Sequence, residues 1–250
     1  MPRHLLALLV YLFACHTYAQ DILIAAENDW PPYSYVLPGS KEPQGLTPLL
    51  VREAFASQDI AVRFVSLTLG QCQKLTIAGK AAACFNVSVT ESNRKQFLWP
   101  RTPLFYEEVG VFGLIPAPPG KVTQQTLQGR TLGITQGYTY PSKLIDDPGI
   151  RKVTARTESQ LIDLLLNKQA DYILMNTLPG MLHLQQHGPA GKRVKRLGVV
   201  GIDAFLLAFS RKHPQGAVLA RKFDAGLQAL HASGRYQQIM DSFRQQIGMP

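Results

Sequence analysis

The chain of 250 residues contains little of what metal centres and hydrolytic sites require, with three cysteines and six histidines. Two of the histidines, His4 and His16, lie near the N-terminus, and the other four are dispersed, at His183, His187, His213 and His231. Zinc sites need clustered His and Cys ligands. No such cluster, no Ser/His/Asp pattern and no glycine-rich phosphate loop occurs in the sequence. We therefore expect no metal, no cofactor and no catalytic residue.

Long apolar runs are also lacking, apart from residues 5–14. This run is shorter than the roughly 20 residues that span a bilayer as a helix. It follows Arg3 and precedes Thr17-Tyr18-Ala19, an arrangement typical of a secretory signal. We expect residues 1–19 to be removed and residues 20–250 to be exported. An alternative is the lipoprotein-like sequence Leu12-Phe13-Ala14-Cys15, which would leave Cys15 acylated.

Acidic residues are few, and 17 Asp and Glu against 26 Lys and Arg give a net charge of +9. The positive charges are dispersed except at Lys192, Arg193, Lys195 and Arg196, which lie in a Gly/Pro-rich stretch without aromatic residues between them. Nucleic-acid sites instead gather basic residues along one face of a domain. We interpret this cluster as a solvated loop and expect no nucleic-acid partner.

Only Cys72 and Cys84 remain in the predicted exported chain. An even number of cysteines in an oxidising compartment favours a disulfide. Cys72 lies on a predicted helix and Cys84 on the strand that follows Gly79, so the two can meet. We expect a bridge that stabilises the fold by roughly 3 kcal/mol; the alternative is two unpaired thiols.

Strand-like and helix-like segments alternate along the chain. The predicted strands are 22–26, 61–67, 82–89, 109–115, 131–135, 153–156, 171–175, 194–200 and 205–209. Helices are predicted to begin at Thr47-Pro48, with Thr47 as N-cap, at residue 70, after Pro141, and after the capping-box sequence Thr157-Glu158-Ser159-Gln160. Another includes Met181 and Leu184, and two more close the chain.

The clearest interruption of this alternation is the Pro/Gly-rich segment 116–120. It divides the chain into two α/β units, and the chain then ends in a strand and two helices. We expect one lobe to contain residues 20–111 and 203–250, and the other to contain residues 112–202. Two strands crossing between the lobes would form a hinge, and the hinge a cleft that closes on a small solute.

The first predicted strand ends at Glu27 and leads into Asn28-Asp29-Trp30-Pro31-Pro32-Tyr33. The two prolines remove backbone donors, so this loop cannot extend the sheet. Ligands of open α/β sheets usually bind at the carboxyl ends of strands. Glu27, Trp30 and Tyr33 are therefore candidate binding residues.

Several motifs follow one another in a fixed order: Trp30-Pro31-Pro32-Tyr33, Ser88-Val89-Thr90-Glu91, Leu132-Gly133-Ile134-Thr135-Gln136-Gly137, Asp171-Tyr172-Ile173-Leu174-Met175-Asn176 and Gly234-Arg235-Tyr236. With this order the chain resembles the family 3 extracellular solute-binding proteins, the receptors of polar amino acid ABC importers. The resemblance implies an α/β, two-lobed periplasmic binding protein type II fold, hinged by two crossing strands. It also implies a monomer that captures a small carboxylate-bearing solute and delivers it to the membrane permease of an ABC importer.

The resemblance also assigns candidate roles to residues on the first lobe. Ser88, Thr90 and Arg94 would bind a carboxylate, because a guanidinium can form two parallel bonds to one. Asn93 is the alternative to Arg94, since the family's arginine position falls on it without a gap. Asn86, two residues before Ser88, would hydrogen-bond the solute or end its strand.

On the second lobe, Tyr138 and Thr139 fall where the family has a helix N-terminus that favours anionic groups. Asn176 falls where the family has the acid that pairs with an α-ammonium group. Either Glu27 substitutes for that acid, or the solute is not an ordinary α-amino acid. Trp30 would stack on the solute or pack under its loop, and Tyr33 has the same two alternatives.

Two other functions remain open at this stage. Periplasmic cyclohexadienyl dehydratases resemble these receptors, and such an enzyme would need a proton-donating acid in the cleft. Glu27, or Glu91 if it turns inward, is the candidate. A ligand-sensing protein that acts on a membrane receptor is the third possibility.

Overall fold

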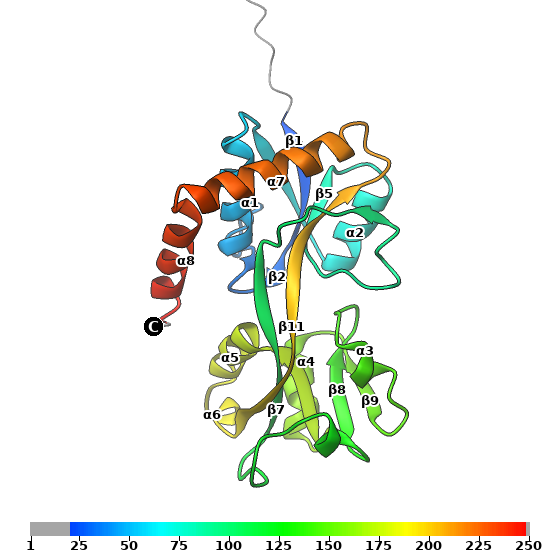
Figure 1. The fold of residues 1–250 in the computed structure, drawn as a ribbon. Helices are drawn as coiled ribbons and strands as arrows, with labels where there is room; N and C mark the ends of the chain where they lie inside the picture. Colours follow the sequence, from blue (N-terminus) through cyan, green and yellow to red (C-terminus); the bar gives the residue numbers. More distant parts are fainter. Residues whose placement is uncertain (1–20, 249–250) are drawn as a thin grey trace, which may run out of the picture.

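The structure is a computed structural model that describes residues 21–248. Two groups of strands and helices are joined by two long antiparallel strands, β7 (Phe105–Leu114) and β11 (Val194–Ser210) (Figure 1). The strands follow one another in the order β4-β1-β5-β11-β7-β10-β8-β9, and β6 also pairs with β11.

Lobe 1 is built on three parallel strands, with β1 between β4 and β5. The N-terminal part of lobe 1 contains β1 (Ile22–Glu27), β2 (Asp29–Trp30), β3 (Ser34–Tyr35), α1 (Leu46–Ala56), β4 (Val62–Leu67), α2 (Leu69–Ile77), β5 (Ala83–Val87) and β6 (Phe97–Leu98). The parallel strands explain why the carboxyl ends of β1 and β5 lie side by side at one edge of the lobe.

Lobe 2 repeats this arrangement, with β8 pairing in parallel with both β9 and β10. It consists of a short 3-10 helix (Gln125–Leu127), β8 (Thr131–Thr135), α3 (Ser142–Ile145), β9 (Arg151–Ala155), α4 (Glu158–Leu166), β10 (Tyr172–Asn176), α5 (Thr177–Gln186) and α6 (Gly188–Gly191). Thr157 is the N-cap of α4, and its hydroxyl accepts a bond from the backbone N–H of Gln160. The predicted capping box is only half formed, because the Gln160 side chain accepts from the N–H of Arg156 and not of Thr157.

The strand β11 is continuous, which corrects the prediction of separate strands at 194–200 and 205–209. Register shifts between Arg196 and Gly198 and between Val199 and Gly201 absorb the irregular segment without a turn. Because β7 pairs with β10 of lobe 2 from Val109 onward, we propose that the lobes join within residues 105–108 and 202–205. The predicted crossing near Val111 lies slightly inside lobe 2 on this division.

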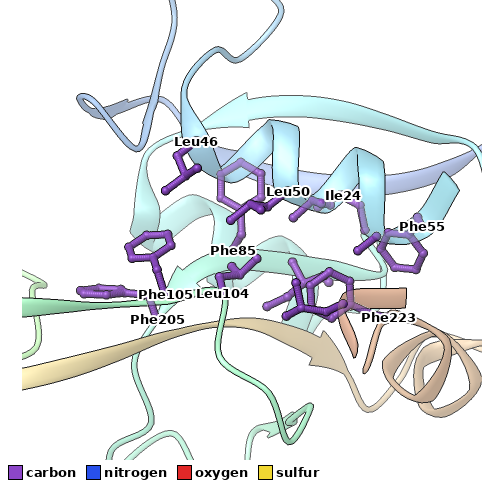
Figure 2. Packing of buried hydrophobic residues seen from close by; sticks show 14 of the residues in the cluster. Ile24, Leu46, Leu50, Phe55, Phe85, Leu104, Phe105, Phe205 and Phe223 are labelled. Carbon is purple, nitrogen blue, oxygen red and sulfur yellow. The ribbon is translucent and has the colours of Figure 1, made fainter. Parts of the chain in front are cut away.

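The closing helices α7 (Gly216–Ala232) and α8 (Arg235–Gln246) pack on lobe 1, beside α1 (Figure 1). Their apolar side chains, including Phe223 and Phe243, join the buried cluster around Ile24. Figure 2 shows part of this cluster, with Phe223 near Phe55. Helices α7 and α1 approach closely at Gly226 of α7, where an added Cβ atom would lie 2.0 Å from the carbonyl oxygen of Ala54 on α1.

Two local predictions in lobe 1 have different outcomes. The first helix begins at Leu46, so Thr47 is not its N-cap. Gly45 takes that position with φ 110°, where an added Cβ atom would lie 2.5 Å from the carbonyl oxygen of Pro32. The predicted disulfide is confirmed: Cys72 on α2 is bonded to Cys84 on β5, with the Cα atoms 5.6 Å apart.

The predicted signal segment, its cleavage after Ala19 and the alternative acylation at Cys15 lie outside the described residues. Within residues 21–248, no helix combines the length and the apolar character needed to cross a membrane.

Candidate functional site between the lobes

A small cavity lies where the two lobes meet. Its volume is about 20 Å³, which is enough for roughly one water molecule. The lining side chains come from both lobes and from β11: Glu27, Trp30, Leu69, Gln73, Asn86, Val87, Ser88, Tyr138, Thr139, Asn176 and Phe205. Seven of these were predicted from the sequence: Glu27, Trp30, Asn86, Ser88, Tyr138, Thr139 and Asn176.

Two larger recesses adjoin this cavity, and Tyr138 lines all three. The first, of about 910 Å³, contains Thr90, Asn93 and Arg94. The second, of about 510 Å³, contains Glu27 together with Asp29, Glu158 and His183. Tyr138 comes from lobe 2 and packs against the buried cluster of lobe 1, so it divides the space between the lobes.

Glu27 ends β1 as a buried acid, with 4% of its surface exposed. The amide of Asn86 donates a bond of 3.2 Å to its Oε2 atom, and the hydroxyl of Thr47 donates a bond of 2.8 Å to Oδ1 of Asn86. Burial raises the pKa of Glu27 to about 8, although the bond from Asn86 opposes this shift. Glu27 is therefore largely uncharged near neutral pH.

Asn86 hydrogen-bonds Glu27 from an unfavourable backbone conformation. It lies one residue before the end of the buried strand β5 with φ 60°, in the left-handed region that side chains other than Asn and Asp seldom adopt. Its amide is fully oriented by Thr47 and Glu27. Asn86 is thus a positioning residue whose side chain connects α1 to the carboxyl end of β1.

Trp30 and Asn176 bring buried N–H groups to the cavity from opposite lobes. Trp30 is 2% exposed and packs against Tyr33 and Phe205, with ring centroids 4.6 and 4.7 Å apart. Asn176, at the end of β10, is 7% exposed. Trp30 Nε1 and Asn176 Nδ2 have no hydrogen-bond partner among residues 21–248. Each lobe therefore contributes one residue with an unpartnered N–H donor to the lining of the cavity.

The helix N-terminus expected near Tyr138 and Thr139 is not there. These residues lie in the turn after β8, and α3 begins only at Ser142 and is four residues long. Tyr138 and Thr139 line the cavity with their own atoms rather than through a helix end. Burial, and next the nearby carboxyl of Glu27, raise the pKa of the Tyr138 phenol well above its usual value, so it is a neutral hydroxyl.

The loop after β5 separates the predicted carboxylate-binding residues. Ser88 lines the cavity, but its hydroxyl donates a 3.0 Å bond to the carbonyl oxygen of Ala204 on β11. Asn93 closes the loop by donating to the Ser88 carbonyl at 2.9 Å and accepting from the Thr90 N–H at 2.8 Å. Thr90 and the exposed Arg94 line the larger recess instead.

Tyr33, also predicted as a ligand residue, lines none of these three spaces. The loop turns its ring toward the hinge, where it stacks on Phe105 with centroids 4.3 Å apart. Its hydroxyl donates a hydrogen bond to Glu107 on β7. Of the two alternatives for Tyr33, the structure therefore shows packing under its loop.

Glu158 was not predicted as a site residue. It is the first residue of α4, it is 4% exposed, and it lines the recess of about 510 Å³. From the sequence, Glu158 is an ordinary acid in the first turn of a helix, a position where the helix dipole stabilises negative charge. No signal in the sequence distinguishes this buried acid from an exposed one.

The chain matches the model of the bacterial extracellular solute-binding proteins, family 3, over residues 22–246. Among solved structures, a histidine kinase sensor domain with similarity to periplasmic binding proteins is 20% identical, with 90% of this chain and 96% of that chain covered and a TM-score of 0.76. An ancestral arginine-binding protein bound to arginine is 18% identical, with 89% and 97% covered and a TM-score of 0.73.

The substrate binding protein of an amino acid ABC transporter is 16% identical, with 89% of this chain and 98% of that chain covered and a TM-score of 0.72. No curated protein matches the chain. These likenesses agree with the α/β, two-lobed periplasmic binding protein fold that is described above. The chain belongs to the bacterial extracellular solute-binding proteins, family 3.

Proposed function

We propose that the protein is a periplasmic receptor that captures a small carboxylate-bearing solute between its lobes and delivers it to the membrane permease of an ABC importer. The observation that carries this proposal is the pair of unpartnered, buried N–H donors at Trp30 and Asn176. They belong to opposite lobes and line the same cavity.

A buried donor without a partner destabilises a structure by about 1–3 kcal/mol. A solute oxygen that accepts from both Trp30 and Asn176 removes this penalty only when the lobes are together. Such a solute binds the closed state more tightly than the open state, and this difference in affinity is what shifts the equilibrium.

The size of the cavity requires the lobes to separate before a solute enters. A space of about 20 Å³ does not hold an amino acid. Within residues 21–248 the long strands β7 and β11 connect the lobes. A rotation of the lobes about residues 105–108 and 202–205 would open the cleft and withdraw Tyr138 from the buried cluster of lobe 1. The solute would then replace Tyr138 in part of the space between the lobes.

A second candidate function is an enzyme of the dehydratase type, and the pKa of Glu27, about 8, favours it. An acid that retains its proton near neutral pH is suited to general acid catalysis. The two functions differ in the fate of the solute, which a receptor releases unchanged. Prephenate that is consumed on incubation with the protein would support the enzyme.

The proposal is tested by thermal shift with a panel of amino acids and small carboxylates. At least one member should raise the melting temperature, because a ligand stabilises the state that it binds. Trp30→Phe and Asn176→Ala should each reduce that shift. Asn167→Ala, which changes an exposed residue at the end of α4, serves as the control and should leave it unchanged. A panel without any shift would contradict the proposal.

A further inference from the structure

The end of lobe 2 that lies away from lobe 1 carries an exposed loop, residues 115–121, which directly follows β7 (Figure 1). Every residue of this proline loop is exposed. Both of its ends are fixed to β11 and the residue before it. The N–H of Ile115 donates a bond of 2.9 Å to the carbonyl oxygen of Arg193, and the N–H of Val122 donates a bond of 3.1 Å to that of Leu197. The loop therefore projects from a firmly held base.

The composition of the proline loop suits an apolar surrounding. Its sequence is Ile-Pro-Ala-Pro-Pro-Gly-Lys, with its one charged side chain, Lys121, at the end. Unpaired backbone N–H groups are costly in a bilayer. Proline has no N–H, and the N–H of Ile115 is already bonded, so only Ala117, Gly120 and Lys121 bring further backbone donors. The loop can thus leave water at a low cost in hydrogen bonds.

Basic residues surround the base of the proline loop. Lys195 and Arg196 lie on β11, which corrects the prediction that the whole basic cluster is a loop. Lys121, Lys192, Arg193 and Lys195 are exposed, and none of them makes an ion pair within residues 21–248. Their charges are therefore available to a partner.

Acidic residues are scarce in the same region. Neither residues 113–130 nor residues 184–201 include an Asp or a Glu. The parallel strands β8, β9 and β10 begin at this end of the lobe, with Arg130 just before β8 and Arg151 at the start of β9. Asp171, just before β10, lies there too, and its carboxylate accepts a bond of 2.7 Å from a backbone N–H of β8. The end of lobe 2 is therefore predominantly positive.

We propose that this end of lobe 2 docks on a bilayer that contains anionic phospholipids, with the proline loop among the headgroups and Lys121, Lys192, Arg193 and Lys195 against the phosphates. The docking goes beyond the proposed function and depends neither on the solute nor on the permease. Apolar residues flanked by basic ones bind the membrane interface by combining buried apolar area with attraction to anionic lipid. An acidic patch on a protein would match the charges but would not account for the apolar loop.

Sedimentation with vesicles tests the docking. The chain from residue 20 onward is used, because the apolar run of residues 5–14 would bind lipid by itself. It should bind vesicles of equal parts phosphatidylglycerol and phosphatidylcholine at least tenfold more tightly than vesicles of phosphatidylcholine alone. High salt should weaken this binding. Equal binding to both vesicles, or binding to neither, would overturn the proposal, even if the protein binds an acidic protein.

A pair of double variants separates this surface from the net charge of the protein. A basic residue near an anionic surface contributes about fivefold to the partition constant, so Lys192→Gln/Lys195→Gln should weaken binding to the anionic vesicles at least tenfold. Lys74→Gln/Lys80→Gln removes the same charge from exposed positions of lobe 1 and should weaken it less than half as much. Neither pair should change the melting temperature. Equal losses would overturn the assignment to lobe 2.

Insertion of the loop is measured by fluorescence quenching with lipids that carry brominated acyl chains. Ala117→Trp should be quenched on the anionic vesicles more strongly than the wild type, which contains Trp30 and Trp99. Leu37→Trp, at a position of lobe 1 that is 46% exposed, is the matched control and should be quenched no more than the wild type. Equal quenching of the two variants would overturn the insertion of the proline loop.

Discussion

The backbone N–H of Leu178 donates a hydrogen bond of 2.8 Å to Oε1 of Glu107. Leu178 lies in the first turn of α5 in lobe 2, and Glu107 lies on the hinge strand β7. The other carboxylate oxygen of Glu107 accepts the hydroxyl of Tyr33 from lobe 1. One carboxylate on the hinge thus holds a group from each lobe, and burial raises its pKa.

Tyr33→Phe should destabilise the protein by about 1–2 kcal/mol, because it removes a donor from a buried carboxylate and leaves the ring packing in place. Urea unfolding followed by fluorescence measures this change. Tyr35→Phe, at a half-buried tyrosine two positions along the same loop, is the control and should change the free energy of unfolding by less than half as much. Equal effects of the two variants would show that the contact with Glu107 does not contribute.

Glu27 should make the ligand-free protein less stable as the pH rises. Its pKa is about 8 in the folded state, against an ordinary value of 4.5. Between these two values the folded state binds more protons than the unfolded state, so the free energy of unfolding falls with increasing pH across this window. Glu158 and Asp29 are the charged groups that raise the pKa of Glu27 further, after burial.

Unfolding in urea at pH 5, 7 and 9 measures this dependence. Asp203, with a pKa of about 6, and Glu107 contribute with the same sign, so the wild type is compared with Glu27→Gln rather than considered alone. The decline from pH 5 to pH 9 should be smaller in the variant. Parallel curves for the two proteins would contradict the assignment of this decline to Glu27.

Removing the disulfide should lower the stability of the protein without abolishing solute binding. Cys72 and Cys84 are separated by 12 positions, and closing a loop of this length stabilises the fold by about 3 kcal/mol in the chain-entropy model. The double variant Cys72→Ser/Cys84→Ser should show this loss in urea. The wild type under reducing conditions is the control and should match it; a variant as stable as the oxidised protein would refute the estimate.

Asn86 combines two effects that a pair of variants separates. Asn86→Gly should destabilise the protein by about 1–2 kcal/mol through the lost bonds to Thr47 and Glu27. Asn86→Ala should destabilise it by about 1 kcal/mol more, because alanine resists the φ of 60° that glycine accepts. If the alanine variant is as stable as the glycine variant, the backbone conformation at this position is not strained.

The sequence predicted the site residues best at the carboxyl ends of strands. The end of the first strand indicated Glu27, whereas the resemblance to the solute-binding family indicated Asn86 and Asn176, and all three line one cavity. The side-chain directions within the connecting loops were not predictable. Tyr33 and Arg94 lie in such loops, where packing against Phe105 or exposure to solvent decides the direction.

Local sequence by itself determined the two α/β units, the disulfide partners and the acid at the end of β1, because periodicity, cysteine count and strand ends are properties of short segments. Tertiary structure alone decided that Tyr138 crosses to lobe 1, that Glu107 holds both lobes, and that Glu158 is buried beside the cleft. These three features depend on contacts between residues far apart in the chain, and the environment of a side chain, not its identity, sets its hydrogen bonds and its charge.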